Sequence, residues 1–257
     1  MLSIKKILFP TNCSEAAKPT LAFTLAVAKY FHAEVVILYV CELKVDTMAP
    51  SVVRYQLLQE EKHKAEQVLD AFLKDFGTHH VPVTKEVEIG FAKENIIAYT
   101  ERNPSIDLIV MSSHDTTSMI QRKIWGTTIS TVIDNAQIPI LVIPKGIVFQ
   151  DIKKMAYLTP NKDHWQKQHP PIQDLAHYFK AQLLVVHLAE SQHAEKELPQ
   201  HFVLENYEED LPSFIHNHNL HLLVTVTTAR TALQRLLRYS SAQKMALNTT
   251  IPLLVWK

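Results

Sequence analysis

Two short polar segments near the middle of the chain carry the residues best suited to holding an anion. The first, residues 112–115, reads Ser-Ser-His-Asp and directly follows an apolar run. The second, residues 126–128, reads Gly-Thr-Thr and opens a segment with apolar residues at helical spacing. A helix start presents backbone N–H groups that have no partner inside the helix, and the two threonines add hydroxyls. Together these segments predict a binding loop for an anionic group such as a phosphate.

The apolar runs on either side of these segments predict the elements that hold them. Residues 106–111 and 139–144 are mostly apolar and do not alternate, which is typical of strands buried on both faces of a parallel sheet. Strand, turn, helix and strand then form a βαβ unit. Open α/β sheets bind ligands in the loop that leaves the first strand of such a unit.

The chain before residue 106 predicts three further strands, at residues 4–9, 34–40 and 81–89, with helices between them. The longest helix is expected from Ser51 to Phe76. Its predicted inward residues are Leu57, Leu58, Val68, Leu69, Phe72 and Leu73. The first half of the chain therefore predicts five parallel strands in a doubly wound α/β sheet with right-handed crossovers.

The second half of the chain matches the first. Residues 4–6 (Ile-Lys-Lys) reappear at 152–154, and residues 30–33 and 35–40 match 178–181 and 183–188, all at an offset of 148. From the fourth strand onward the offset falls to 114 and then 113, so 34 residues are missing where the first copy has its long helix. The sequence predicts two such parallel-sheet α/β domains, residues 1–145 and 151–257, the second shortened.

The predicted binding loop resembles that of universal stress (UspA-like) proteins. In that family the strand ends in Met-Gly-(Ser/Thr)-His-Gly, and Gly-Ser follows nine residues later. Ser112 and Asp115 replace the two turn glycines here, and ten residues separate Asp115 from Gly126. The resemblance implies a tandem of two adenine nucleotide alpha hydrolase-like domains and an ATP site in the first. The residues that it assigns to the nucleotide are Pro10, Thr11, Asn12, Val40, Met111, Ser112, His114, Asp115, Gly126, Thr127 and Thr128.

Asp115 changes what this loop is expected to hold. A carboxylate where the family has glycine adds bulk and repels a phosphate. We therefore expect a stress-response protein without catalytic activity and with a degraded ATP site in the first copy. Two alternatives stay open: a genuine adenine-nucleotide binder, and a binder of another small ligand at the same place. The last glycine of the chain is Gly146, so the second copy contains none, and no nucleotide is expected there.

The resemblance also implies how the two copies associate. In the family the fifth strands of two domains meet across a pseudo-twofold axis. Here residues 140–143 and 253–256 are expected to do so within one chain, as an intramolecular pseudo-dimer. A homodimer of the whole chain is a further possibility, and the sequence indicates no particular protein partner.

Composition argues against several classes of protein. The formal net charge is zero, which gives no overall field for nucleic acid or an anionic membrane. No apolar run approaches the roughly 20 residues that span a bilayer, and the N-terminus lacks a signal-peptide pattern, so we expect a cytoplasmic protein.

The cysteines and histidines are weaker candidates for chemistry. Cys13 and Cys41 follow neighbouring strands, where they could form a redox pair or simply be small residues under loops. Of the fourteen histidines, His216 and His218 are expected in a loop before a strand, without the spacing of a zinc enzyme. No metal site and no catalytic residues are predicted.

Overall fold

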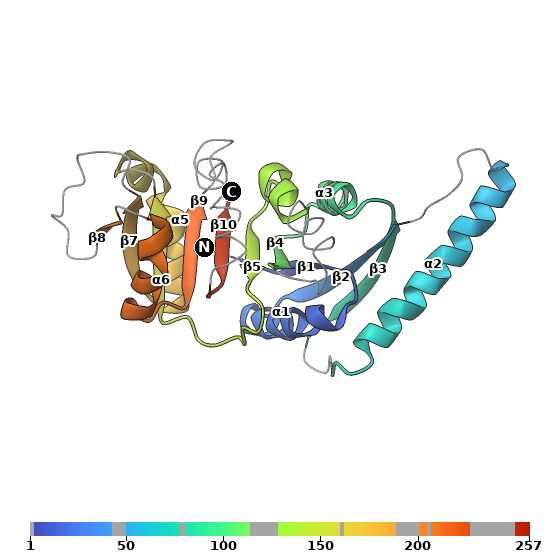
Figure 1. The fold of residues 1–257 in the computed structure, drawn as a ribbon, viewed down its shortest axis with the longest axis horizontal. Coiled ribbons are helices and arrows are strands. Elements are labelled where there is room, and N and C mark those ends of the chain that lie inside the picture. The colour runs from blue at the N-terminus through green and yellow to red at the C-terminus, as the bar shows by residue number, and fades with distance from the viewer. Residues whose placement is uncertain are drawn as a thin grey trace. The chain divides into compact units, whose positions relative to one another are not determined.

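The computed structural model describes residues 3–42, 50–77, 81–113, 128–159, 162–188, 201–204, 207–226 and 250–257 (Figure 1). Four predicted site residues, His114, Asp115, Gly126 and Thr127, lie outside these ranges. The chain divides into two compact units. The first is Ile4–Ile138, and the second combines Met1–Ser3 with Pro139–Lys257. The domain limits expected from the sequence, 1–145 and 151–257, stay a prediction.

The first unit is built on four parallel strands, β1 (Lys6–Thr11), β2 (Glu34–Cys41), β3 (Val83–Ile89) and β4 (Leu108–Ser112). Their order across the sheet is β3-β2-β1-β4. All of β4 is buried, as is β1 after its first residue. Because both faces of these two strands are covered, their sequences show no polar alternation. The α/β class expected from the sequence is confirmed.

Three helices connect these strands, α1 (Lys18–Phe31), α2 (Ser51–Leu73) and α3 (Ala92–Arg102), and residues 128–135 are also helical. α1 packs on β1, β2 and β4 through residues such as Leu21 and Val27, which are 0% and 3% exposed. It begins with Pro19 in its first turn, where a missing N–H costs nothing. It ends at His32, which adopts the left-handed conformation with φ 54°.

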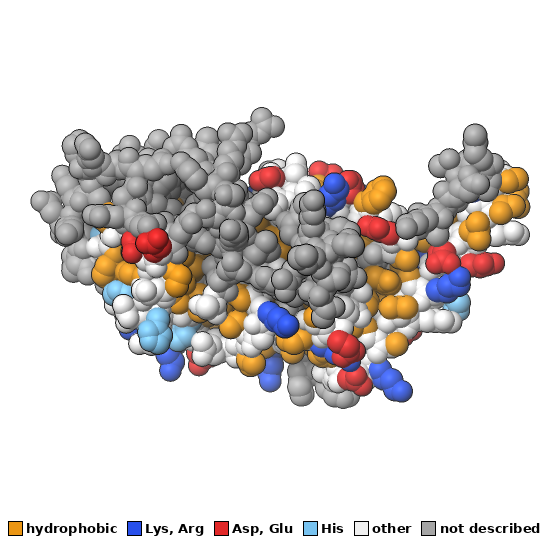
Figure 2. Space-filling view, viewed as in Figure 1, with side chains coloured by type: hydrophobic (Ala, Val, Ile, Leu, Met, Phe, Trp, Pro, Cys, Tyr) orange, Lys and Arg blue, Asp and Glu red, His pale blue; other side chains and the backbone are white. Residues whose placement is uncertain are grey.

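α2 departs from the prediction in its exposed side chains. Leu69 and Phe72 are buried as expected, but Leu57, Leu58 and Val68 are 39%, 37% and 44% exposed, so for these three the expected burial was wrong. A helix of 23 residues is roughly 34 Å long, whereas the seven-residue β3 is roughly 23 Å long. α2 therefore extends beyond the sheet that it packs on, and Figure 2 shows hydrophobic side chains at its outer end, at the upper right.

The second unit has six strands, β5 (Ile140–Ile143), β6 (Lys154–Thr159), β7 (Gln182–Leu188), β8 (His201–Leu204), β9 (Leu222–Val226) and β10 (Leu253–Trp256). Their order is β5-β10-β9-β6-β7-β8. All neighbours are parallel except β5 and β10, which are antiparallel, so this sheet is mixed. α5 (Lys162–Phe179) and α6 (Tyr207–His218) belong to this unit.

α6 corrects a second expectation. His216 and His218 lie in its last turn and not in a loop. Leu211, Phe214 and Ile215 form the buried side of this helix, at 2%, 8% and 7% exposure. The polar residues around the histidines concealed this short apolar face. Among the described residues, no helix is both long and apolar enough to cross a membrane.

Gly90 offers a test of the first unit's packing. Its φ is +141°, and a Cβ there would lie 2.5 Å from Asn95 Nδ2. Gly90→Ala should therefore lower the free energy of unfolding by about 1–3 kcal/mol, measured by urea denaturation followed by circular dichroism. Gly146→Ala is the control, because φ is +78° there but nothing lies within 4 Å, so only about 1 kcal/mol of backbone strain is expected. Equal losses in both variants would contradict a steric role for Asn95.

Candidate functional site

The carboxyl ends of β1, β2 and β4 meet at one edge of the first unit's sheet. β1 is hydrogen-bonded to both of the other strands, and all three run parallel. Thr11 of β1 pairs with Tyr39 of β2, and Leu8 of β1 pairs with Ile109 of β4. Neighbouring strands lie about 4.8 Å apart. Thr11 ends β1 three residues after Leu8, and Ser112 ends β4 three residues after Ile109, so the two paired strands end at the same edge of the sheet.

Buried hydroxyl groups mark this edge. Thr11, Ser112 and Ser113 are 2%, 5% and 4% exposed, although each is at or beyond the end of its strand. Thr128, at the first described position of the following helix, is 2% exposed. Hydroxyls can both donate and accept hydrogen bonds, so the edge can suit either a ribose or a phosphate. Met111 is 1% exposed and therefore belongs to the apolar core beneath this edge.

The turn after β1 is held by its own side chains. The backbone N–H of Cys13 donates to Thr11 Oγ1, and that of Ser14 donates to Asn12 Oδ1, each over 3.0 Å. Cys13 adopts the left-handed conformation with φ 57°, which is uncommon for a residue other than glycine. A 3-10 turn, Glu15–Ala17, follows and leads into α1. This turn is therefore closely constrained where the sequence predicts contact with a nucleotide.

The structure brings together part of the predicted site. Pro10 and Thr11 end β1, Asn12 follows, Val40 is the penultimate residue of β2, and Met111 and Ser112 end β4. Thr128 is described, whereas His114, Asp115, Gly126 and Thr127 are not. The ligand contacts of these residues stay a prediction.

Tyr39 is a residue at this edge that the sequence reading missed. It is partly exposed and pairs with Thr11, so both side chains point to the same face of the sheet. Burial, followed by the neighbouring thiols of Cys41 and Cys13, raises the pKa of its hydroxyl. The phenol therefore remains a neutral hydrogen-bonding group. Only the pairing register between β1 and β2 could have indicated it.

Cys13 and Cys41 are unsuited to act as reactive thiols. Burial raises the pKa of Cys13 to about 12, and burial followed by the charge of Glu61 raises that of Cys41. Redox-active cysteines need an accessible thiolate. Both thiols are instead protonated at neutral pH, which favours the interpretation as small residues beneath loops over a redox pair.

Two histidines of the second unit are hydrogen-bonded to each other. His187 Nε2 and His201 Nδ1 share a hydrogen bond of 2.9 Å between β7 and β8. Within the described ranges, no group of three His, Cys, Asp or Glu residues is arranged to hold a metal ion.

The sequence and the fold together identify a family. Residues 3–144 match the model of the "Universal stress protein family". The chain belongs to this family. A universal stress protein of Methanocaldococcus jannaschii is 29% identical over 142 residues, which cover 55% of this chain and 82% of the relative. A second one from the same organism is 28% identical over 160 residues, covering 55% and 95%.

Solved universal stress proteins also share the fold over nearly the whole chain. A crystal structure from Archaeoglobus fulgidus DSM 4304 superposes with a TM-score of 0.75 at 15% identity, covering 99% of this chain and 97% of the other. A putative universal stress protein from Pseudomonas aeruginosa UCBPP-PA14 has a TM-score of 0.58 at 17% identity, covering 99% and 93%. At such identities the similarity concerns the fold alone.

The raised thiol pKa of this universal stress protein can be measured by alkylation. In a Cys41→Ser variant, Cys13 is the remaining cysteine. At pH 8 a pKa near 12 leaves roughly one thiol in ten thousand ionised, against about a quarter for an ordinary cysteine. Iodoacetamide labelling, followed by mass spectrometry, should therefore be more than 100-fold slower in the folded protein than in urea. Its rate should still be rising tenfold per pH unit at pH 9. A plateau near pH 8.5 would show that the Cys13 thiol is not shielded.

Proposed function

We propose that this universal stress protein is a non-catalytic stress-response protein whose first unit holds a degraded ATP site. The observation that carries the proposal is the convergence of the β1, β2 and β4 ends, which gathers Thr11, Asn12, Val40 and Ser112 at one sheet edge. Ligands of open α/β sheets bind at this edge. The proposed site therefore retains its adenosine side and is weakened on its phosphate side.

The constrained turn after β1 supports the adenosine side. Thr11 and Asn12 already accept backbone hydrogen bonds, so the turn is formed before any ligand arrives. Preorganisation reduces the entropy that a ligand must overcome on binding. The partly exposed Val40 supplies apolar surface beside the turn, which suits the flat face of a purine.

Asp115 is the reason for proposing weak phosphate binding. Two like charges about 4 Å apart repel by roughly 4 kcal/mol at an effective dielectric near 20. A helix N-terminus offers an anion only about 0.3–1 kcal/mol, and up to ~2 kcal/mol in a favourable site. Repulsion therefore dominates unless a divalent cation lies between the two groups. Asp115 lies outside the described residues, and its place beside the phosphate is a prediction from the sequence.

We also propose that the second unit is a shortened repeat of the first. The strand order β8-β7-β6-β9 reproduces β3-β2-β1-β4. β6 lies 148 residues after β1 at both of its ends. The helices that follow these two strands are α1 and α5. Each is followed by a residue in the left-handed conformation, His32 with φ 54° and Lys180 with φ 53°, and these residues are also 148 positions apart. Non-glycine residues seldom adopt this conformation, so its recurrence at one offset supports common descent of the two units.

Details around these helix ends support the same proposal. Tyr30 and Phe31 form an edge-to-face ring pair with centroids 5.5 Å apart, and Tyr178 and Phe179 form another at 5.8 Å. The backbone N–H of Glu34 donates to the carbonyl oxygen of Lys5, and that of Gln182 donates to the carbonyl oxygen of Lys153, each over 2.9 Å. The two hydrogen bonds are again 148 residues apart. β5 belongs to the second compact unit, but the sequence assigns it to the first repeat. On that assignment its antiparallel pairing with β10, in which Leu141 lies opposite Leu254, supports the proposed pseudo-dimer of the two repeats.

Calorimetry with Asp115→Gly tests the degraded site. The wild-type chain should bind adenosine more tightly than Mg-free ATP, and the variant should gain at least tenfold in ATP affinity with adenosine affinity unchanged. Asp151→Gly is the control, because Asp151 is exposed and lies outside the proposed site. ATP or ADP released at near one per chain from purified wild-type protein would contradict the proposal.

A genuine adenine-nucleotide binder is the second candidate, and the buried hydroxyls of Ser112, Ser113 and Thr128 favour it. These groups are able to contact phosphate oxygens. If Mg²⁺ offsets Asp115, wild-type ATP affinity should rise with magnesium and Asp115→Gly should lower it. A thermal-shift panel of uncharged metabolites distinguishes a re-purposed pocket, in which neither nucleotide nor adenosine stabilises the protein.

A further inference from the structure

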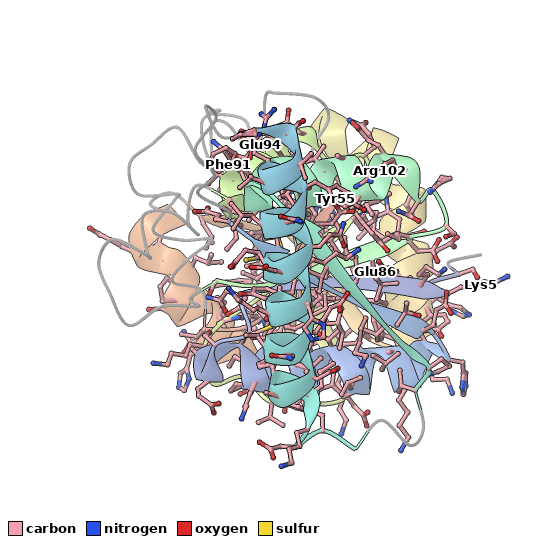
Figure 3. All side chains as sticks on the ribbon, turned by 90° about the vertical axis from the view of Figure 1, so that its right-hand side faces the viewer. Lys5, Tyr55, Glu86, Phe91, Glu94 and Arg102 are labelled. Atoms are coloured by element: carbon pink, nitrogen blue, oxygen red, sulfur yellow. The ribbon has the colours of Figure 1, made fainter. Side chains whose placement is uncertain are left out.

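The N-terminal half of α2 carries a large exposed apolar surface. Val52 is 67% exposed, Tyr55 64% and Leu58 37%, whereas Leu69 and Phe72 in the C-terminal half are 1% and 5% exposed. Figure 3 views α2 along the front of its unit, with Tyr55 at its side. Apolar surface concentrated in this way marks interaction sites on soluble proteins.

The exposed residues continue the face by which α2 packs on its own sheet. Steps of three, four and seven residues lead from Phe72 through Leu69 and Ala65 to Leu58 and Tyr55, so all five lie on one side of the helix. The sheet covers this face only as far as Ala65, which is 3% exposed. An uncovered helix is marginally stable in water, so a second surface packed on Leu58 and Tyr55 would account for the length of α2.

The charged residues beside this face can pair with the same residues of a second copy. Arg54 and Glu61 are seven residues apart and therefore lie on the same flank of the helix. When two copies of α2 pack antiparallel about a twofold axis, Tyr55 of each copy meets Leu58 of the other. Arg54 of each then lies beside Glu61 of the other, which gives two ion pairs around two apolar layers.

Other orientations are less favourable. A parallel pair would bring Glu61 beside Glu66 of the second copy, which places like charges together. In the antiparallel pair the ends of the overlap are polar, since Lys62 lies opposite Ser51. Polar ends limit the contact to the segment from Ser51 to Lys62.

Glu61 is already paired within its own helix, but this does not prevent the contact. Lys64 Nζ lies 2.6 Å from Glu61 Oε1, and the side chain of Lys64 is 63% exposed. An exposed pair of this kind contributes little and is easily rearranged. A carboxylate can also accept from two donors at once.

From these observations we propose that residues 51–62 of α2 are a self-association surface, at which two copies of this chain pair antiparallel. The overlap is shorter than a standard protein interface, so the dimer is weak, with a dissociation constant on the order of micromolar. The proposal is independent of nucleotide binding, because it uses no residue of the candidate ligand site.

Sedimentation equilibrium of the full chain over a wide concentration range tests the surface. Leu58→Asp should abolish association, and Arg54→Glu should weaken it at least tenfold because both copies then present carboxylates. Combining Arg54→Glu with Glu61→Arg should restore the wild-type constant within about threefold, since the ion pairs re-form with reversed polarity. Val53→Asp is the matched control, because Val53 is 42% exposed on the opposite side of α2 and should have no effect.

Three results would overturn the proposal. The first is a wild-type chain that stays monomeric at hundreds of micromolar. The second is a dimer that survives Leu58→Asp, because another surface would then hold it. The third is a charge-reversed double variant that associates no better than Arg54→Glu, which would exclude the antiparallel pairing. Circular dichroism of each variant establishes that α2 is still helical.

Discussion

The parallel pairing of β1 with β2 and β4 is the constraint on which the first unit depends. Each strand must be apolar on both faces, because helices cover the sheet on both sides, and this requirement excludes polar side chains until the strands end. Polar chemistry is therefore displaced to the carboxyl edge. There Thr11 and Ser112 end two neighbouring strands, because β1 and β4 pair with each other in parallel and in a definite register.

The two units share this sheet arrangement but differ in the loops that could bind a ligand. Both have the strand order of an open α/β sheet, and both carry buried threonines at the end of the central strand, Thr11 and Thr159. The second unit, however, has no glycine in the loops that would approach a ligand, since none occurs after residue 146. The chain from β2 to β3 also includes α2, whereas β7 and β8 are joined by residues 189–200 alone. A sheet can thus be kept while the loops that give it a function diverge.

Local sequence patterns predicted most of this fold, and their failures have physical causes. The strands of the first unit were predicted to within two residues, because apolar runs of this length leave few alternatives. Leu58 was misjudged because periodicity identifies the apolar face of a helix but not how far the opposing sheet extends. Tyr39 was missed because its position beside Thr11 depends on register, which pairing sets and no single segment contains. The effect of Asp115 on phosphate binding stays a prediction from its charge and size, because this residue lies outside the described ranges.

In the part of the chain that the structure describes, four residues other than glycine hold the left-handed backbone conformation: Cys13, His32, Lys180 and Asn219. In a chain with four glycines among 257 residues, these turns store conformational strain of about 1–2 kcal/mol each. His32, Lys180 and Asn219 each directly follow the last residue of a helix, and the tertiary packing of that helix maintains their left-handed conformation. At Cys13 the conformation is maintained by two hydrogen bonds, one from its own N–H to Thr11 Oγ1 and one from the Ser14 N–H to Asn12 Oδ1. Natural or laboratory evolution toward heat resistance therefore has three turns in which glycine would relieve strain away from the candidate site, and one in which the same change would loosen the loop that a ligand must meet.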